Sequence, residues 1–470
     1  MTILEIAILA SLAVFIGWLG RGRKLALLAL SALALYWLQP YQEPVNLMFW
    51  LPTLTLIVAA LSWMITANDE SRSWKENRGA AIVLLGVIVL VDLNRFFQFE
   101  WIFAVETPRF QWIALVVLCV AGMVLVIARL GEFKRFVLVT AIVLLIGLLA
   151  LIKTPSAAAW LFEAVANLRG KEAPGQSTVA WLGFSYVAFR LLHTLFDRLA
   201  GRLPSVPLAD YVNYVIFFPA ITAGPIDRLE RFVAGFNAPL VLDAEGWVDA
   251  GRRIFSGLFK KFVLADGLAW IALSETFVRD AQSSGWLWML LYAYSLRIYF
   301  DFSGYTDIAI GLGRLLGIRL PENFDAPYLK PNLTQFWNSW HITLTQWFRS
   351  YFFNPLTRAM RSSHKPVATW AMILFSQLAT MALIGLWHGV TINFVLWGLW
   401  HGCGLFIQNR WSELMRARLS VQAMAPSTQK IFRFAGIFLT FNFVSLGWLF
   451  FALPSLEAVW SAALKLAGVL

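Results

Sequence analysis

Long apolar runs follow one another along this 470-residue chain, and they constrain its fold more than any other feature. Six such runs precede residue 155, at 3–20, 24–40, 45–66, 79–97, 111–128 and 134–153. A helix needs roughly 20 apolar residues to cross about 30 Å of hydrocarbon. Because 59% of the residues are hydrophobic and only 14% are charged, we predict an all-α, polytopic integral membrane protein.

The net charge of +11 raises the question of a nucleic-acid partner. The Lys and Arg residues, however, gather in loops between apolar runs, as at 20–24, 68–78 and 129–135. The positive-inside rule explains such loops, so we predict that they are cytoplasmic and that no nucleic acid is bound. Cys119 and Cys403 both lie in apolar surroundings, which leaves no disulfide framework and no cysteine-based metal site.

The character of the apolar runs changes along the chain. The first run lacks a basic segment before it and a cleavage site after it, so we predict a membrane helix and not a signal peptide. The later run 212–232 contains Pro219, Gly224 and Pro225, and broken backbone at membrane depth needs protein or water to satisfy it. We therefore expect re-entrant or tilted helices around an internal cavity in the second part, with two conventional spans near 432–452 and 455–470. The predicted parts are N-terminal transmembrane helices at 1–153, an extracytoplasmic connection at 154–177, a core at 178–452 and a C-terminal helix at 453–470.

Two histidines lie in Trp-His-Gly triplets within the apolar stretch 384–402. His388 ends a long apolar run and is followed by Gly389, a residue type common at helix C-termini. A helix C-terminus favours the charged ring and apolar burial favours the neutral ring, a balance suited to a general base. The alternative is a buried histidine satisfied by a neighbouring carbonyl. His401 lies among closely spaced glycines, and we interpret it as one polar group on a helix that packs tightly.

A third histidine, His341, lies in an aromatic-rich segment with helical spacing. The apolar positions three or four residues apart are Trp337, Trp340, Leu344, Trp347 and Tyr351, and a polar stripe with the same spacing consists of Asn338, His341, Thr345 and Arg349. This pattern predicts one continuous helix. Its polar face is the lining of a wet cavity or, equally, the water-facing side of an interfacial helix.

Other motifs carry weaker signals. His193 and Asp197 match an HxxxD spacing used by some soluble acyltransferases, but at i and i+4 of a helix a local hydrogen bond is favoured. Asp301 and Asp307 lack a nearby histidine or further acids, so we predict no metal site, and His364 lies in a polar loop where we expect it to be solvated. The absence of a Walker A sequence and of a nucleophile elbow argues against an ATP-driven transporter and a serine hydrolase.

Several segments in combination resemble the membrane-bound O-acyltransferases, in particular the bacterial branch that modifies polysaccharides. They are "FFPAITAGPIDRLERF" (217–232), "YFDFSGYTDIAIGLGRLLGIRLPENFDAPYL" (299–329), "FWNSWHITLTQWFRSYFFNPL" (336–356), "GLWHGVTINFVLWGLWHG" (385–402) and "FVSLGWLFF" (443–451). The resemblance implies a multi-helix bundle around a central tunnel, with an acyl donor on the cytoplasmic side and an acceptor on the other. It places the family's near-invariant histidine at His388 and its second polar position at His341.

From this resemblance we predict acyl transfer, with acetyl favoured, from a cytoplasmic thioester to a hydroxyl of an extracytoplasmic polysaccharide or of an accessory acyltransferase that relays it. His388 and His341 are the predicted catalytic residues. The predicted substrate-binding residues are Asn338, Thr345, Arg349, Asn393 and Trp387. No tightly bound cofactor is expected, and the donor is acetyl-CoA or a phosphopantetheine thioester on an acyl carrier. The implied location is the bacterial inner membrane.

Three alternatives to acetyl transfer follow from the same residues. The "AGPIDRLERF" run resembles the branch that transfers D-alanyl groups to teichoic acid as much as the alginate branch, which keeps D-alanyl transfer open. Broken helices with polar linings also describe a transporter or flippase, although that class predicts inverted repeats that the sequence does not display. A scaffold for a polysaccharide export complex would need neither histidine.

Overall fold

The computed structural model describes residues 1–40, 46–97, 107–129, 134–168, 179–239, 243–363, 367–418 and 425–469. Across these ranges every regular element is a helix, and the sole extended pairing is an isolated bridge between Phe324 and Trp340. The predicted all-α fold is therefore confirmed. His364 and residues 169–177 of the predicted connection lie outside the described ranges. The chain divides into two compact units, Met1–Ile254 with Ile308–Pro321, and Phe255–Asp307 with Glu322–Leu470.

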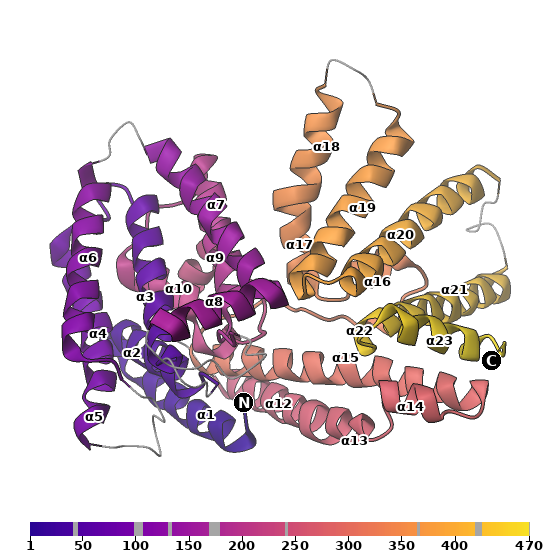
Figure 1. Ribbon diagram of the computed structural model, residues 1–470, viewed down its shortest axis with the longest axis horizontal. Helices are drawn as coiled ribbons and strands as arrows, with labels where there is room; N and C mark the ends of the chain where they lie inside the picture. Colours follow the sequence, from indigo (N-terminus) through magenta and orange to yellow (C-terminus); the bar gives the residue numbers. More distant parts are fainter. Residues whose placement is uncertain are drawn as a thin grey trace. The chain divides into compact units, whose positions relative to one another are not determined.

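The first unit consists of helices drawn from indigo to magenta in Figure 1, together with residues 308–321 from later in the chain. Its elements are α1 (Ile3–Trp18), η1 (Gly20–Gly22), α2 (Arg23–Trp37), α3 (Leu47–Thr66), α4 (Trp74–Asp92), α5 (Asn94–Phe97), α6 (Phe110–Arg129), α7 (Lys134–Lys153), α8 (Pro155–Leu168), α9 (Phe184–Leu199), α10 (Leu208–Ile216), η3 (Phe218–Ala220), α11 (Leu229–Asn237) and most of α12 (Ala244–Leu258).

The second unit includes the helices that carry the candidate site. Its elements are η4 (Phe259–Ala265), α13 (Asp266–Ala269), α14 (Glu275–Asp280), most of α15 (Ser284–Leu315), η5 (Pro327–Leu329), α16 (Leu333–Trp337), α17 (Ile342–Phe348), η6 (Arg349–Phe353), α18 (Asn354–Arg361), α19 (Thr369–His388), α20 (Ile392–Arg418), α21 (Pro426–Gly447), α22 (Leu449–Ala452) and α23 (Leu456–Leu466).

Six helices among the described residues are long and apolar enough to span a membrane, which makes the chain a multi-pass membrane protein. They are Leu47–Thr66, Trp74–Phe96, Phe110–Arg129, Lys134–Lys153, Thr369–His388 and Pro426–Ala452. The predicted runs at 3–20 and 24–40 form shorter helices of 16 and 15 residues. The predicted span at 455–470 is wrong, because α23 has only 11 residues and packs in a core with α14, α15 and α22.

The predicted break within 212–232 is present, between the end of α10 and the start of α11. Arg190 of α9 is buried and donates hydrogen bonds to the carbonyls of Tyr214 (3.3 Å), Val215 (2.9 Å) and Ala220 (3.0 Å). A Cβ at Gly224 would overlap with Ala220, so only glycine permits this turn. The guanidinium thus satisfies carbonyl groups that the broken helix leaves without helical partners.

Helices α19 and α20 run side by side through contacts at glycines (Figure 1). A Cβ on Gly385 of α19 would overlap with the carbonyl of Phe394, and a Cβ on Gly398 of α20 would overlap with that of Met381. Small residues at such positions let two helix backbones approach closely. The interpretation of the stretch around His401, residues 395–404, as a tightly packing, glycine-rich helix is therefore confirmed.

The predicted continuous helix through His341 is wrong. Helix α16 ends at Trp337, a turn follows, and α17 starts after His341, whose backbone is left-handed with φ 43° and ψ 53°. The chain turns here because Trp340 pairs with Phe324 and the amide of Asp325 donates to the carbonyl of Ser339 at 3.0 Å. The predicted polar stripe is divided accordingly, since His341 is buried whereas Asn338 and Arg349 are exposed.

Candidate active site

Both predicted catalytic histidines, His341 and His388, contact the side chain of Trp387 in the second unit. The ring centroid of Trp387 lies 6.1 Å from that of His341 and 4.6 Å from that of His388. His341 is supplied by the turn before α17 and His388 by the last position of α19. Residues separated by 47 positions in the sequence are thus brought together, as predicted.

His388 is half-buried at the end of a membrane-length helix, followed by Gly389, whose amide donates to the carbonyl of Gly385 at 3.3 Å. Besides Trp387, its ring is surrounded by Phe451, Trp397 and Phe394, with centroid distances of 4.8, 5.5 and 6.1 Å. This aromatic surrounding restricts the orientation of the imidazole. An imidazole that is surrounded by apolar side chains and is still partly accessible is suited to remove the proton of a reacting hydroxyl.

His341 lies outside the six membrane-length helices and is 2% exposed. Burial lowers the pKa of His341 well below its ordinary value, and the nearby imidazole of His388 lowers it further. The ring is therefore neutral at neutral pH and keeps one nitrogen lone pair. Its Nδ1 lies 3.2 Å from Oδ1 of Asn323, and its face meets Phe302 with a centroid distance of 4.7 Å.

Asn323 is a site residue that the sequence reasoning missed. It is buried and follows α15, 18 positions before His341, and no helical periodicity connects the two. The only available signal was the position of Asn323 between a Glu and a Phe inside the segment "LPENFDAPYL".

The predicted substrate-binding residues lie in different settings. Arg349 donates to Oδ1 of Asn338 at 2.7 Å, which forms an exposed pair, and Trp387 lies between the two histidines. The amide of Thr345 donates to the carbonyl of His341 at 3.0 Å, while the buried Asn393 donates to the carbonyl of Leu453 at 2.9 Å. The hydrogen bond of Asn393 holds the backbone at Leu453. Substrate binding by the five predicted residues stays a prediction.

His401 has a different setting, in contact with Trp337, Trp397 and Phe443. It is fully buried, and within the described part of the chain neither of its ring nitrogens has a hydrogen-bond partner. An unsatisfied buried polar group costs about 1–3 kcal/mol. The structure therefore supports the interpretation of His401 as a packing residue.

We expect His401→Leu to keep the rate of the predicted acyl transfer and to raise the unfolding free energy by up to about 1–3 kcal/mol, because an apolar side chain of similar size removes the desolvation penalty. Thermal denaturation in detergent and initial transfer rates would measure both. A large loss of rate in a variant of normal stability would show instead that His401 takes part in the reaction.

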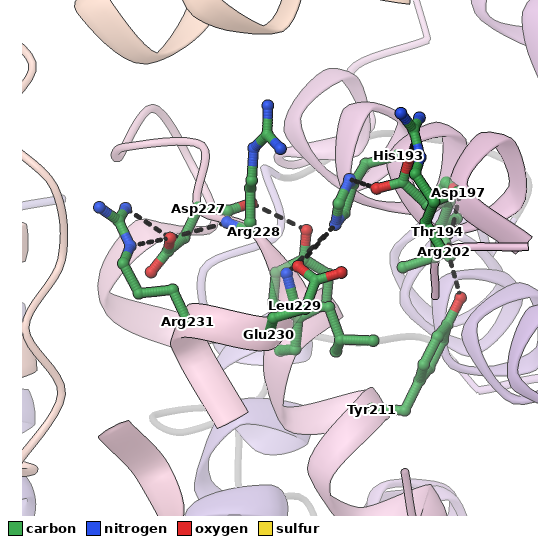
Figure 2. Close-up of polar contacts among 12 residues, drawn as sticks. His193, Thr194, Asp197, Arg202, Tyr211, Asp227, Arg228, Leu229, Glu230 and Arg231 are labelled. Atoms are coloured by element: carbon green, nitrogen blue, oxygen red, sulfur yellow. Dashed lines mark hydrogen bonds and ion pairs between the residues drawn. The ribbon is translucent and has the colours of Figure 1, made fainter. Parts of the chain in front are cut away.

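The HxxxD motif forms a polar cluster in the first unit (Figure 2). Among the described residues, His193, Asp197 and Glu230 are the one group of such side chains at metal-ligand spacing, with candidate atoms within 4.8 Å of one another. The amide of Leu229 donates to Nε2 of His193 at 3.2 Å, so the ring proton is on Nδ1, which lies 3.2 Å from Oδ2 of Asp197. Both ring nitrogens are thus engaged by protein groups, and the expected local hydrogen bond is confirmed.

We expect His193→Ala to lower the unfolding free energy by about 1–3 kcal/mol, since Asp197 and the amide of Leu229 would lose a buried partner. The turnover of the folded protein should stay unchanged. Thermal denaturation and rates normalised to folded protein would measure these effects. A rate that fell a hundredfold at unchanged stability would contradict the structural role.

The two aspartates considered as metal ligands have basic partners instead. Asp307 pairs with Lys260 at 2.6 Å, and Asp301 pairs with Lys261. Both lysines belong to η4, a short π-helical segment. The positive charges of the lysines account for these carboxylates without a cation.

The described fold and site define a polytopic, all-α membrane protein that holds a pair of histidines around a tryptophan. Residues 132–447 match the sequence profile of the "MBOAT, membrane-bound O-acyltransferase family", and the chain belongs to that family.

Three relatives indicate the range of the family around this chain. "Probable alginate O-acetylase AlgI" of Azotobacter vinelandii is 36% identical over 281 residues, which are 59% of this chain and 52% of the relative. "Teichoic acid D-alanyltransferase" of Streptococcus thermophilus is 31% identical over 290 residues, 59% of this chain and 69% of the relative. "Peptidoglycan O-acetyltransferase" of Helicobacter pylori is 34% identical over 264 residues, 55% of this chain and 47% of the relative. The chain spans about half the length of the alginate relatives that it matches.

Proposed function

We propose that this protein is an O-acyltransferase that moves an acetyl group from a cytoplasmic thioester to a hydroxyl of an extracytoplasmic polysaccharide or of a relay protein. The observation that carries the proposal is the convergence of His341 and His388 on Trp387. The relatives named for acetylation of alginate and of peptidoglycan support acetyl as the transferred group. A multi-pass protein acting on such a polymer belongs in the bacterial inner membrane.

In the proposed reaction His388 removes the proton of the attacking hydroxyl, a role typically worth about 10² to 10⁴ in rate. The hydroxyl oxygen bonds to the thioester carbon, the C–S bond breaks, and the thiolate takes up the proton from His388. His341 holds the donor carbonyl or the acceptor through a hydrogen bond. The exposed Arg349 and Arg358 are suited to the phosphates of CoA or phosphopantetheine, because guanidinium groups bind phosphate by charge-assisted hydrogen bonds.

D-alanyl transfer is the second candidate. It is favoured by the match to the teichoic acid enzyme of Streptococcus thermophilus, which covers 69% of that relative. The two donors differ in that a D-alanyl group carries an amine. A D-alanyl site would need a hydrogen-bond acceptor or a negative charge for this amine, close to the thioester carbonyl. An acetyl group would make no use of that acceptor or charge.

The test uses purified protein in lipid vesicles with radiolabelled acetyl-CoA, acetyl-phosphopantetheine carrier protein or D-alanyl carrier protein, each supplied with alginate, peptidoglycan fragments or teichoic acid. We expect label on the polymer with one acetyl donor. Label only from the D-alanyl donor would select the second candidate. Absence of transfer with every pair, also after addition of cell-envelope extract as a source of relay proteins, would contradict the enzymatic function.

A further inference from the structure

Asn323 gives both of its carbonyl oxygens to the start of α17. Its main-chain oxygen accepts from the amide of Ile342 at 3.0 Å, and its side-chain Oδ1 accepts from the amide and the hydroxyl of Thr343 at 3.1 and 2.9 Å. The side chain of His341, at the N-cap position of α17, does not cap this helix. Asn323 therefore performs the capping from a distant position and fixes the turn that carries His341.

The same Oδ1 lies 3.2 Å from Nδ1 of His341, and this contact determines where the imidazole proton is. A backbone N–H can only donate, so the atom of Asn323 that faces the amide of Thr343 is the carbonyl oxygen and not the amide nitrogen. That oxygen has no proton and can only accept. The neutral ring of His341 consequently carries its proton on Nδ1 and its lone pair on Nε2.

The contacts of Asn323 also stabilise the unusual backbone conformation of His341. A non-glycine residue with positive φ is uncommon and strained, so it persists where the surroundings hold it. Here Asn323 accepts hydrogen bonds from the amides of Ile342 and Thr343, the two residues that follow His341, and so holds the chain directly after it. Ring position and ring tautomer therefore depend on one side chain.

We propose that Asn323 is a positioning residue that fixes His341 as the Nδ1-protonated tautomer, so that Nε2 serves as a hydrogen-bond acceptor in the active site. This inference rests on the proposed acyl transfer for its kinetic consequences. A neutral ring of this tautomer cannot donate from Nε2 to a thioester carbonyl. His341 therefore acts on the acceptor side of the reaction, where Nε2 accepts a hydrogen bond from a hydroxyl next to the one that His388 deprotonates.

Two substitutions of Asn323 test the role of its acceptor oxygen, because one keeps this oxygen and the other removes it. Asn323→Asp keeps an acceptor at Oδ1 and adds a negative charge, which raises the pKa of His341. Because transfer needs the neutral ring, we expect near-normal kcat at alkaline pH and an acid limb of kcat/KM displaced to higher pH. Asn323→Leu removes the acceptor, and we expect kcat to fall about tenfold, less than the 10² to 10⁴ typical of the loss of a general base, with KM for the donor unchanged.

The tautomer itself can be measured without turnover. In protein labelled with ¹⁵N-histidine, the signals lost in His341→Gln identify those of His341. We expect a protonated Nδ1 and an unprotonated Nε2 in the unmodified protein and in Asn323→Asp, and a mixture of tautomers in Asn323→Leu. A protonated Nε2 in the unmodified protein would overturn the inference, whereas the expected tautomer in a protein without any transfer activity would contradict the proposed function alone.

Asn332 provides a matched control from the same connection. Its Oδ1 accepts from the amide of Gln335 at 2.9 Å and caps α16, whereas Asn323 caps α17, the helix that starts after His341. Asn332→Leu should lower stability through the lost cap and leave the pH profile and the tautomer unchanged. Should Asn323→Leu fail to fold, the Asn323→Asp pH profile decides the matter. An unshifted profile in that variant, or an equal shift in Asn332→Leu, would refute a specific role for Asn323.

Discussion

Replacing His388 with alanine is expected to lower the rate of acyl transfer by about 10² to 10⁴, the usual contribution of a positioned general base. The imidazole is the polar group that the end of α19 presents between Trp387, Trp397 and Phe451, and alanine leaves no base in that place. Initial rates in vesicles would give the size of the loss. Because the imidazole is half-buried, protein level and thermal stability should change little.

His401→Leu is the appropriate comparison, because both histidines belong to Trp-His-Gly triplets and only one is placed beside His341. A loss confined to His388→Ala would separate the chemical histidine from the packing histidine. Equal activity of His388→Ala and the unmodified protein would remove His388 from the mechanism. Equal losses in both variants, accompanied by aggregation in detergent, would point to disrupted packing of α19 and α20 as the cause.

Local sequence signals predicted the parts of this molecule that local physics determines. An apolar run that ends in histidine and glycine does end a helix at His388, and the prolines within 212–232 do interrupt the helix. The glycines around His401 predicted a close helix contact, which forms between Gly398 and the carbonyl of Met381. In each case the residues that determine the structure are near one another in the sequence.

The arrangement around His341 could not be predicted in this way. The spacing of Trp337, Trp340 and Leu344 is that of a helix, yet the chain turns at His341 because a partner 18 residues upstream binds the next amides. Periodicity reports which side chains prefer an apolar surrounding and contains no information on such distant hydrogen bonds. The predicted polar stripe does not form because the helix is broken at His341. The tautomer of His341 depends on its contact with Asn323.

The position of His388 depends on the close approach of α19 and α20, and Gly385→Ala tests that dependence. The added Cβ would overlap with the main-chain carbonyl of Phe394, which cannot move aside as a flexible side chain would. Overpacking typically costs about 1–3 kcal/mol, and a clash with backbone falls at or above the upper end of that range. Since Gly385 is one helical turn before His388, we expect both a lower melting temperature and a loss of transfer rate.

Gly147→Ala in α7 is the control, because its added Cβ meets nothing within 4 Å and an alanine in a helix gains about 0.5–1 kcal/mol over glycine. A Gly385→Ala protein as stable and as active as Gly147→Ala would mean that the two helices do not need this glycine contact to place the imidazole of His388.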